Sequence, residues 1–486
     1  MPGCLGGWAW PALGLLTCLL SGAAAWLSQD LPARLRIHLG LLLLAGLCWM
    51  ASAAIIARSR MPRRALGWLL SVALLVRLPG WLLPPRHSDD HVRYLWDGEV
   101  GRRGISPYAG PPDDPIYAEV RAARPTLHAA INNRHLPTIY PPALQLGFRA
   151  GVALGGLWGW KAVVAAADLL TLGLLVRLCR QRGQDLRWAA LWGWSPLCAL
   201  ELAHNAHTEA LALAPCMATL LLWQRPLASG VLWGVALLAK PLAVALLPAA
   251  LRRRDRGRFV AAAALSVLLL LAPHLSAGTR LMGSLGEYGR RWRANDGAFA
   301  LVYAASEAVV ARLYPPPHHE PWAWHRLARV ITGRDRDTVF PDELAAVLAR
   351  AAVAAILLGL GLWLVRGSLR WLGPAEGALV FTGASLLLTP VLHPWYLLWA
   401  LALCPLWPAA APPVLVLCAL APLAYLPLES WLTGGGWHEP TWARFLQHGA
   451  AWGTLALVVV SRSFDAAKAA NYTKLIPKWS DRPHIV

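Results

Sequence analysis

Long apolar runs recur from one end of the sequence to the other, and each can cross a hydrocarbon core of about 30 Å. Hydrophobic residues make up 57% of the 486 residues and charged residues only 15%, which is typical of integral membrane proteins. The 27 tryptophans suit the two interfacial belts of a bilayer. We therefore predict an all-α, polytopic integral membrane protein.

Charge and cysteine content narrow the class further. The 45 Lys and Arg residues outnumber the 26 Asp and Glu residues, but many arginines lie in short loops between apolar runs. Such basic loops fix orientation in the membrane, so we expect no nucleic-acid partner. The eight cysteines lie near the N-terminus or inside apolar runs, so we expect neither disulfides nor a zinc site.

The basic loops also orient the predicted spans. With a cytoplasmic N-terminus, the loop Arg58 to Arg64 lies inside and residues 85–159 form a large outer loop. Because the basic loop Arg177 to Arg187 should also lie inside, residues 141–157 are expected to form an interfacial helix. The stretch Trp8 to Leu27 lacks a basic n-region and is longer than a usual signal-peptide core, so we expect a retained span.

One apolar run conflicts with a full crossing. Residues 228–250 are followed by the basic cluster Arg252 to Arg258, which a full crossing would place outside. We interpret this run as a re-entrant hairpin broken at Lys240-Pro241, because proline removes a backbone donor. Each half would be only about 18 Å long at a rise of 1.5 Å per residue, too short to span. A second outer loop then covers residues 278–345.

The sequence thus predicts a bundle of about twelve transmembrane helices, a re-entrant hairpin and two large outer loops. The spans are expected near 8–27, 35–57, 65–84, 160–179, 188–203, 207–223, 259–277, 346–366, 374–390, 395–408, 412–428 and 446–461. Residues 1–64 hold two N-terminal transmembrane helices, residues 65–462 the membrane core, and residues 463–486 a cytoplasmic tail. The tail is basic, which agrees with a location inside.

An acidic pair, Asp89 and Asp90, follows the third predicted span at the start of the first outer loop. Carboxylates beside a bilayer are costly to hold charged, so proteins keep them mainly where they handle protons, ions or substrate charge. The same segment carries His87, His91 and Arg93, more ionisable groups than a simple connector needs. We interpret the pair as part of an active site, the alternative being a solvated loop start.

The predicted topology collects further polar groups on the same side of the membrane. They are the segments His204 to Glu209 and Glu287 to Asp296, the residue His393, and Lys240 in the hairpin. Carboxylates beside Lys, Arg and His suit a reaction in which a base deprotonates an acceptor while cations hold a phosphate leaving group.

Each of these groups also has a structural interpretation. Lys240 can snorkel to the headgroups, and His393 with Tyr396 can belong to an interfacial aromatic belt. The stretch Gly286 to Gly297 can be a solvated basic loop. Tyr140 stands immediately before two prolines, where it can simply precede a helix start.

A metal centre is another chemistry that the second polar segment can hold. His204, Asn205, His207 and Glu209 are of types that metals accept as ligands. Their spacing matches no dedicated metal motif. We therefore expect no metal ligand set and no cofactor, although these residue types do not exclude a divalent metal.

Several segments together resemble a known family. They occur in one order from about residue 65 to 410: SDDHVRYLWDG, GISPYAGPPDD, LPTIYPPALQ, AHNAHTEAL, LLAKPLAVALLP, GEYGRRWRANDGAFAL and HPWYLLWALAL. They are similar to bacterial polytopic glycosyltransferases of the GT-C superfamily, close to the group described as glycosyltransferase 87 or polyprenyl-phosphate mannosyltransferase-like. No single segment is specific, but the ordered set is. The resemblance implies a GT-C-like catalytic membrane core over residues 65–462.

By this resemblance the protein is expected to be a glycosyltransferase (hexosyltransferase) of the inner or plasma membrane. It would move a sugar, with mannose favoured, from a polyprenyl-phosphate carrier to a lipid or glycan acceptor at the extracytoplasmic face, with inversion. Its partners would be donor, acceptor and membrane lipid. Asp89 is implied as the general base, with Asp90 as the second choice. The residues expected to bind substrate are Arg93, Tyr94, Tyr140, His204, Asn205, Lys240, Arg290, Arg293, Asn295, Asp296, His393 and Tyr396.

Two points qualify the resemblance. The resembled group more often shows Gly-His-Asn-Asp where this chain has Ala203-His204-Asn205-Ala206, and residues 1–60 carry no assigned chemistry. Two other functions also stay open. One is a lipid-linked glycan polymerase or ligase, which uses a lipid-diphosphate donor, and the other is a transporter or flippase of lipid-linked sugars, which would show repeated halves.

Overall fold

The computed structural model of the protein describes residues 5–59, 65–313, 341–367 and 372–475. Within these ranges the chain forms helices and no strand, with one isolated parallel bridge between Ala294 and Val391. The predicted all-α fold is confirmed for this part of the chain. Its apolar helical stretches long enough to cross a membrane are Ala9–Arg58, Ala65–Leu82, Leu157–Gln181, Arg256–Gly289, Asp342–Arg366 and Pro412–Trp431. The chain is a multi-pass membrane protein, while the number of twelve spans and the re-entrant hairpin stay predictions.

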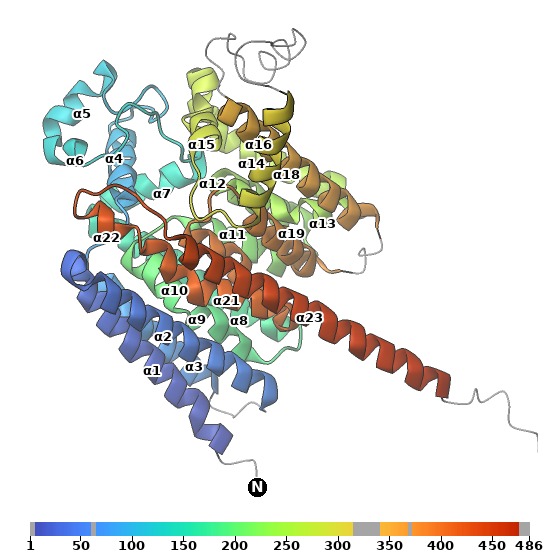
Figure 1. Ribbon diagram of the computed structural model, residues 1–486. Coiled ribbons are helices and arrows are strands. Elements are labelled where there is room, and N and C mark those ends of the chain that lie inside the picture. The colour runs from blue at the N-terminus through green and yellow to red at the C-terminus, as the bar shows by residue number, and fades with distance from the viewer. Residues whose placement is uncertain (1–4, 60–64, 314–340, 368–371, 476–486) are drawn as a thin grey trace, which may run out of the picture.

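The N-terminal helices form a hairpin against the rest of the molecule (Figure 1). Helix α1 (Leu5–Leu27) and helix α2 (Leu31–Arg58) are joined by the turn η1 (Ser28–Asp30) and pack along each other. Helix α3 (Ala65–Leu82) packs against α1, and α2 packs against α21 (Pro412–Leu420). The first two helices are therefore docked on the core.

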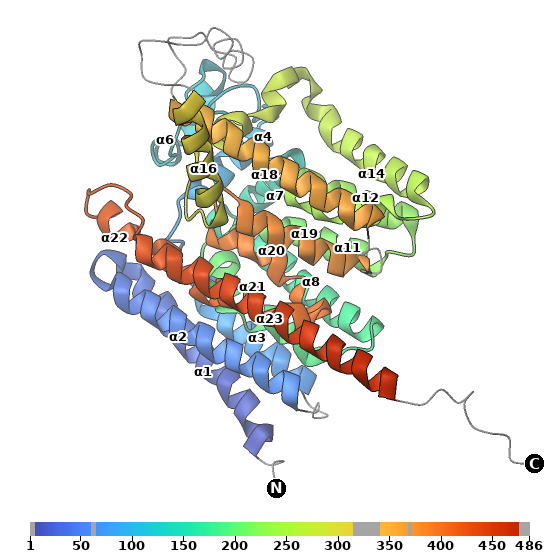
Figure 2. The same ribbon diagram turned by 45° about the vertical axis from the view of Figure 1, so that its right-hand side comes forward.

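The described parts of the two predicted outer loops lie at the same end of the molecule. The first loop forms α4 (Asp90–Arg102), α5 (Ala118–Ala123), α6 (Pro125–Ala129) and α7 (Pro142–Ala153), and the second begins with α15 (Leu285–Arg291) and α16 (Ala298–Leu313). Figures 1 and 2 show all of them at the top, whereas α1 begins and α23 (Thr441–Leu475) ends at the bottom. Helices α4 and α7 pack closely at Gly98, which has no side chain. A Cβ added there would lie only 2.5 Å from the carbonyl oxygen of Phe148.

The core helices follow most of the predicted spans, but the expected spans 188–203 and 395–408 are broken into short segments, the second into η9 (Pro394–Leu397), α20 (Leu398–Leu401) and η10 (Cys404–Leu406). Helix α12 ends at Ala239 and Lys240 is extended, with φ −149° and ψ 130°, so the helix stops at the predicted break. The expected span 188–203 is instead a series of short turns, because Ser195 caps a new turn that begins at Pro196. The remaining helices are α8 (Leu157–Gln181), α9 (Ala190–Gly193), α10 (Pro196–Cys198), α11 (Glu209–Leu221), α12 (Pro226–Ala239), α13 (Leu247–Leu251), α14 (Arg256–Leu271), α18 (Pro341–Arg366), α19 (Pro374–Leu388), α20 (Leu398–Leu401) and α22 (Leu428–Trp431).

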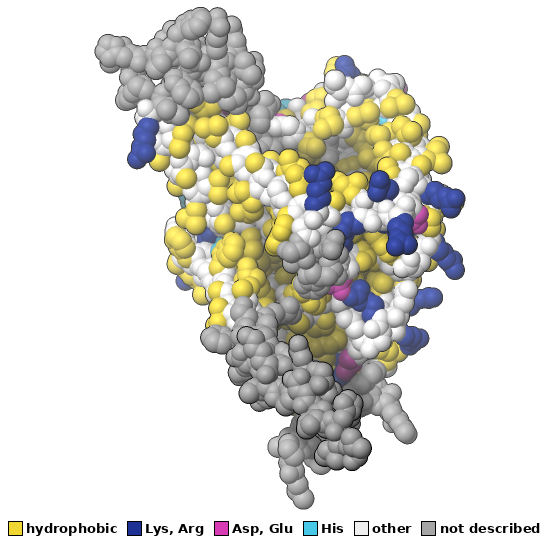
Figure 3. Space-filling model, turned by 90° about the vertical axis from the view of Figure 1, so that its right-hand side faces the viewer, with side chains coloured by type: hydrophobic (Ala, Val, Ile, Leu, Met, Phe, Trp, Pro, Cys, Tyr) yellow, Lys and Arg dark blue, Asp and Glu magenta, His cyan; other side chains and the backbone are white. Residues whose placement is uncertain are grey.

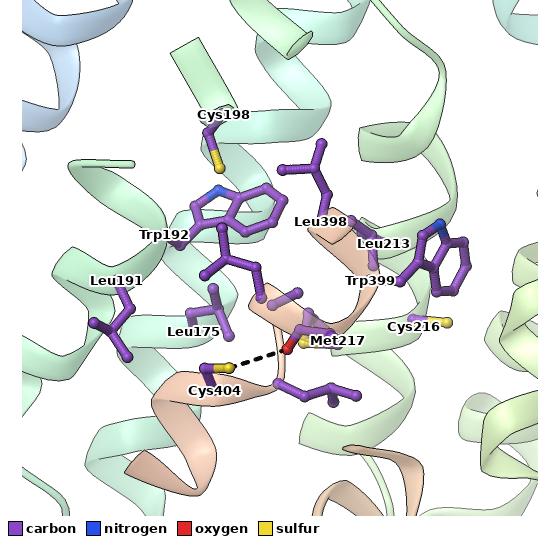
Figure 4. Close-up of a cluster of buried hydrophobic side chains, with 14 of the residues drawn as sticks. Leu175, Leu191, Trp192, Cys198, Leu213, Cys216, Met217, Leu398, Trp399 and Cys404 are labelled. Carbon is purple, nitrogen blue, oxygen red and sulfur yellow. Dashed lines mark hydrogen bonds between the residues drawn. The ribbon is translucent and has the colours of Figure 1, made fainter. Parts of the chain in front are cut away.

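An apolar core joins the long helix α8 to these short segments (Figure 4). Leu175 of α8, Trp192 of α9, Leu213 of α11 and Leu398 of α20 are all buried. The cysteines in the described ranges are free thiols, and Cys404 donates its S–H to the carbonyl of Ala400, four residues back. The short turns are thus fixed by packing rather than by their own length.

The outer surface of the helices is apolar. On α14 the side chains of Leu265, Leu268 and Leu269 are 56%, 61% and 65% exposed. Figure 3 shows hydrophobic side chains spread over one face of the molecule, with Lys and Arg gathered on one part of it. Leucines so exposed along a helix suit contact with lipid rather than with water.

A buried ion pair joins α3 to α8 inside this apolar body. Arg77 Nε lies 2.5 Å from Asp168 Oδ2, and both side chains are fully buried. Trp192 donates its indole N–H to Asp168 at 2.8 Å, and Arg77 donates to the carbonyl of Gly193 at 2.5 Å. The pair therefore ties α3, α8 and α9 together, and its partners satisfy each other where water is absent.

We expect Asp168→Ala to lower the free energy of unfolding by about 3–5 kcal/mol, because it leaves the Arg77 guanidinium buried without its counter-ion. Thermal melting in detergent measures this loss. The double variant Arg77→Met with Asp168→Leu removes both charges and should recover much of it. A double variant as unstable as Asp168→Ala would contradict a charge-pair explanation.

Candidate active site

Lys161 of α8 holds two chain segments together beneath the outer loops. Its Nζ donates hydrogen bonds of 2.8 Å to the carbonyls of Gly80, Leu83 and His204. An ammonium group has three donors, so all of them are used. Gly80 and Leu83 mark the end of α3, and His204 closes the π-helical turn η4 (Ala199–His204). Lys161 thereby fixes the start of the first outer loop beside the polar segment that follows η4.

The acidic pair lies at the start of α4, and its two carboxylates have different neighbours. Asp89 is exposed and accepts a hydrogen bond of 2.8 Å from the side-chain amide of Asn132. Asp90 is 32% exposed, accepts a weak 3.5 Å hydrogen bond from Tyr94, and lies 3.9 Å from His207 Nε2. Asp89 thus faces the outer loop, whereas Asp90 faces the protein interior.

The protein environment raises the pKa of both carboxyl groups. Although Asp89 reaches solvent, the surrounding protein removes part of its hydration and raises its pKa, while hydrogen bonds from its own backbone and from Asn132 oppose this rise. Loss of hydration also raises the pKa of Asp90; the charge of His207 opposes the rise, and the charge of Asp89 adds to it. A carboxylate with a raised pKa is a stronger base than an ordinary one.

The backbone after η4 brings Glu201 and His207 together. Residues six apart in an α-helix are rotated by roughly 240° and point in different directions. Here the π-helical turn and a left-handed Ala206, with φ 55°, change that path, so that His207 N–H donates to the carbonyl of Glu201. His207 Nδ1 then lies 2.9 Å from Glu201 Oε2. Turns of this kind and strained residues are frequent at functional sites.

Lys240 is held inside the protein by a carboxylate. Its Nζ lies 2.8 Å from Oε1 of Glu209, which is fully buried at the start of α11. The same Nζ lies 5.5 Å from the ring centre of Tyr396, whose hydroxyl is 2.9 Å from that of Tyr288. These contacts favour a site role for Lys240 over snorkelling to headgroups.

The segment His393 to Tyr396 lies against the second polar segment. The ring of Trp395 stacks on His393 with centres 4.4 Å apart and on His207 with centres 3.9 Å apart. Trp395 therefore covers His207 in the second polar segment, and Tyr396 lies beside Lys240 at the break. This placement gives the aromatic segment more than an interfacial role.

Residues Arg293, Asn295 and Asp296 anchor the second outer loop. Asp296 pairs with Arg293 at 2.6 Å and with Arg444 of α23 at 2.7 Å. Asn295 donates its side-chain amide to the carbonyl of Leu392 at 3.2 Å, next to His393. Protein partners therefore engage the polar groups of these three predicted substrate-binding residues and tie the second loop to α23 and to the segment before His393.

Arg93, Tyr94 and Tyr140 hold the first outer loop in a similar way. Arg93 Nε lies 3.0 Å from Asp97 Oδ1, one helical turn along α4. Tyr94 stacks on Phe148 of α7 with ring centres 4.9 Å apart, and Tyr140 meets the edge of Tyr94 at 5.0 Å. Only Tyr94 of the three contacts the acidic pair, through its weak hydrogen bond to Asp90.

His204 and Asn205 face the N-terminal hairpin. His204 Nε2 lies 3.2 Å from Ser28 Oγ of η1, and Asn205 Oδ1 lies 3.2 Å from His87 Nδ1. The other nitrogen of His87 lies 2.8 Å from His38 Nε2 of α2. All five side chains are buried. The N-terminal hairpin, to which the sequence assigned no chemistry, therefore supports the second polar segment through Ser28 and His38.

The geometry does not gather the residues that could have bound a metal. His204 faces Ser28 while His207 faces Glu201, and Glu209 faces Lys240. Among the described side chains, no group of three or more His, Cys, Asp and Glu is arranged to hold a metal ion. The predicted substrate-binding residue Arg290 lies in α15, but its side chain is outside the described part of the chain.

Comparison with known families adds an independent observation. A family model described as "Alpha-(1->6)-mannopyranosyltransferase, N-terminal domain" matches residues 4–253, just over half of the 486 residues. The chain belongs to this mannosyltransferase family. No curated protein and no solved structure matches it significantly. The matched region contains the acidic pair, η4 with the polar segment after it, and Lys240, and it confirms the resemblance to a GT-C-like mannosyltransferase.

In this mannosyltransferase three contributors to the site were not assigned from the sequence. They are Glu201 and His207, which pair with each other, and Glu209, which pairs with Lys240. Their sequence signal was present, since carboxylates in or beside apolar runs are costly and have partners or functions. The pairing of Glu201 with His207 depends on the π-helical turn, and the pairing of Glu209 with Lys240 depends on contact between distant elements, and no local pattern specified either contact.

We expect Ala206→Gly to stabilise the mannosyltransferase by about 0.5–1 kcal/mol, because glycine adopts a φ of 55° without the strain that alanine has there. Detergent melting gives the measurement. Ala203→Gly is the matched control, because Ala203 lies inside η4 with helical geometry and should be destabilised by glycine. Equal losses of stability in both variants would show that glycine relieves no backbone strain at the position of Ala206.

Proposed function

We propose that the protein transfers a mannosyl group from a polyprenyl-phosphate carrier to a lipid or glycan acceptor at the extracytoplasmic face, with inversion. One observation carries the proposal: Asp90, His207, Lys240 and Tyr396, from separate elements, converge beneath the end that carries both outer loops. Family membership supports the mannosyl group, and the linkage printed for the family supports a 6-hydroxyl as the acceptor oxygen.

Asp89 is the proposed general base. It is exposed, so an acceptor hydroxyl can reach it, and its raised pKa favours proton uptake. The acceptor O–H proton passes to Asp89 while the oxygen forms a bond to the anomeric carbon. The bond from that carbon to the phosphate oxygen breaks, and the lipid phosphate leaves with the bonding electrons. A single displacement of this kind inverts the anomeric configuration.

Lys240 is the proposed partner of the leaving phosphate. A phosphate departs as a stable anion, so it needs a fixed cation more than a proton donor. Glu209 holds the ammonium beside Tyr396 and Tyr288, whose hydroxyls are further donors for phosphate oxygens. The donor phosphate therefore approaches an ammonium that is already positioned and has little freedom to lose.

A comparison of donors tests the proposal against its rivals. Purified protein receives labelled polyprenyl-monophosphate mannose or a labelled polyprenyl-diphosphate glycan, and label in the acceptor fraction is measured. Transfer from the monophosphate supports the proposal. Transfer from the diphosphate alone would identify a polymerase or ligase, and label moved across vesicle membranes without transfer would identify a transporter.

We expect Asp89→Asn to reduce transfer by about 100-fold to 10,000-fold, because the amide keeps the size of the side chain but cannot accept the proton. Asp90→Asn should cost less. The transfer rate of the wild type should fall at acid pH with a midpoint above the ordinary Asp pKa of about 3.9. The reason is that the pKa of Asp89 is raised and the base works only when deprotonated.

Asp113→Asn is the matched control for the acidic pair, since Asp113 is an outer-loop aspartate paired with His128 at 3.0 Å. It should leave transfer unchanged. Full transfer by Asp89→Asn with an inactive Asp90→Asn would move the base by one residue. Full transfer by both variants would reject the acidic pair as catalytic.

We expect removal of the Lys240 charge to reduce transfer by about 100-fold or more, because the departing phosphate loses its fixed cation. Lys240→Ala alone leaves Glu209 buried without its partner and can destabilise the fold. The double variant Lys240→Met with Glu209→Gln removes both charges and separates the two effects. We expect it to melt near the wild type yet to remain inactive, whereas wild-type transfer by this double variant would exclude Lys240 from the site.

A further inference from the structure

His207 lies between two carboxylates, one at each ring nitrogen. Nδ1 is 2.9 Å from Glu201 Oε2, and Nε2 is 3.9 Å from Asp90 Oδ2. The side chain is 1% exposed, and the stacked ring of Trp395 covers one of its faces. Nε2 has no hydrogen-bond acceptor within normal distance in the described part of the chain, and the nearest charge to it is Asp90. The ring is therefore fixed in orientation, with its second nitrogen aimed at the acidic pair.

Glu201 is built to hold this ring. Its side chain is fully buried, and the hydroxyl of Tyr425 donates to its two oxygens at 2.8 and 3.1 Å. Asn205 adds a weak hydrogen bond of 3.3 Å from its amide. Hydrogen bonds of this kind stabilise the ionised form, but a buried carboxylate also needs a counter-charge. His207 is the cation within ion-pair distance of it, and a doubly protonated ring can donate to Glu201 and toward Asp90 together.

The charges around the site compensate one another in part. Lys240 is matched by Glu209, and His207 lies between Glu201 and Asp90. The hydrogen-bond partner of Asp89 is the neutral side-chain amide of Asn132, whereas the other carboxylates lie beside a charged group. The adjacent carboxylates of Asp89 and Asp90 repel each other. The positive ring of His207 lies beside Asp90 and therefore favours the ionised form of Asp90 over that of Asp89.

We infer that His207, held by Glu201, positions Asp90 and keeps it ionised, which leaves Asp89 as the carboxylate that takes the acceptor proton. His207 is a positioning residue in this scheme, because it acts through Asp90. The proton on His207 stays there during transfer, so the bonds made and broken are those of the proposed reaction. The inference rests on the proposed function for the role of Asp89.

Other ionisable groups face His207 and take part in the balance. Glu209 adds negative charge, while His87, His91 and His393 repel a positive ring. The loss of hydration of the three histidines favours their neutral forms, and His91, which lies in the outer loop, has its pKa lowered to about 4. Near neutral pH the carboxylates of Glu201, Asp90 and Glu209 act on His207 and favour its protonated form.

The test measures the protonation of Asp90 directly. Carbodiimide labels a carboxyl group only while it carries its proton, so mass spectrometry of labelled protein at a series of pH values gives the midpoint for Asp90. We expect His207→Gln to raise this midpoint by about one pH unit, because a neighbouring cation has been removed. The acid limb of the transfer profile, which Asp89 sets, should move to lower pH, because a protonated Asp90 no longer repels the Asp89 carboxylate. Purely structural damage would lower transfer at every pH without moving either midpoint.

Glu201→Gln provides a second variant that leaves His207 in place and can still accept hydrogen bonds from Tyr425. Without the anion behind it His207 holds its proton less tightly, so the Asp90 midpoint should again rise. The double variant should resemble His207→Gln alone, because Glu201 acts through His207. Additive shifts, or an unmoved Asp90 midpoint in both single variants, would overturn the inference.

His128→Gln is the matched control, because it breaks a histidine–carboxylate pair with Asp113 on the outer loop. It should leave the Asp90 midpoint where it is in the wild type. The labelling needs no sugar donor, so it decides the inference by itself. Wild-type protein that fails to use polyprenyl-phosphate mannose would overturn the proposed function alone.

Discussion

The three hydrogen bonds of Lys161 set the frame on which the site depends. Helix α3 and the turn η4 both stop at this ammonium, and unpaired carbonyls at such ends are costly where water is scarce. Because the Lys161 side chain satisfies these carbonyls, both α3 and η4 can end there without leaving unpaired backbone groups. The acidic pair follows one of these ends, and Glu201 with His207 borders the other.

Charge compensation explains why so many ionisable groups can be held in a largely apolar body. Asp168 is matched by Arg77 in the core, and Glu209 is matched by Lys240 nearer the site. The first pair has additional hydrogen bonds from Trp192 and the backbone, which suits a structural role. In the second pair Lys240 is 15% exposed and lies beside Tyr396, whose hydroxyl contacts that of Tyr288. This partial exposure suits a cation that also meets a ligand.

Sequence patterns predicted the features that depend on composition along the chain. Apolar runs predicted an all-α fold, Pro241 predicted the helix end at Ala239, and the acidic pair stood out against its apolar surroundings. The broken course of residues 186–204 was missed, because an apolar run has the same composition whether it forms one helix or several turns. The pairings of Glu201 and Glu209 were missed for a related reason. They depend on a left-handed Ala206 and on contacts between distant elements, which no local spacing encodes.

The candidate site contains residues from both halves of the chain, and the second loop contributes by holding the aromatic segment in place. The region that matches the mannosyltransferase family carries the carboxylates and Lys240. The later region adds the aromatic segment from His393 to Tyr396, which covers His207 and Lys240. Its position is fixed by the second loop, because Asn295 binds the carbonyl of Leu392 and Asp296 binds Arg444 of α23. The anchoring of the second loop therefore sets the distance between the aromatic segment and the charges beneath it. In this arrangement residues far from any reacting atom determine the geometry in which the donor phosphate would meet Lys240.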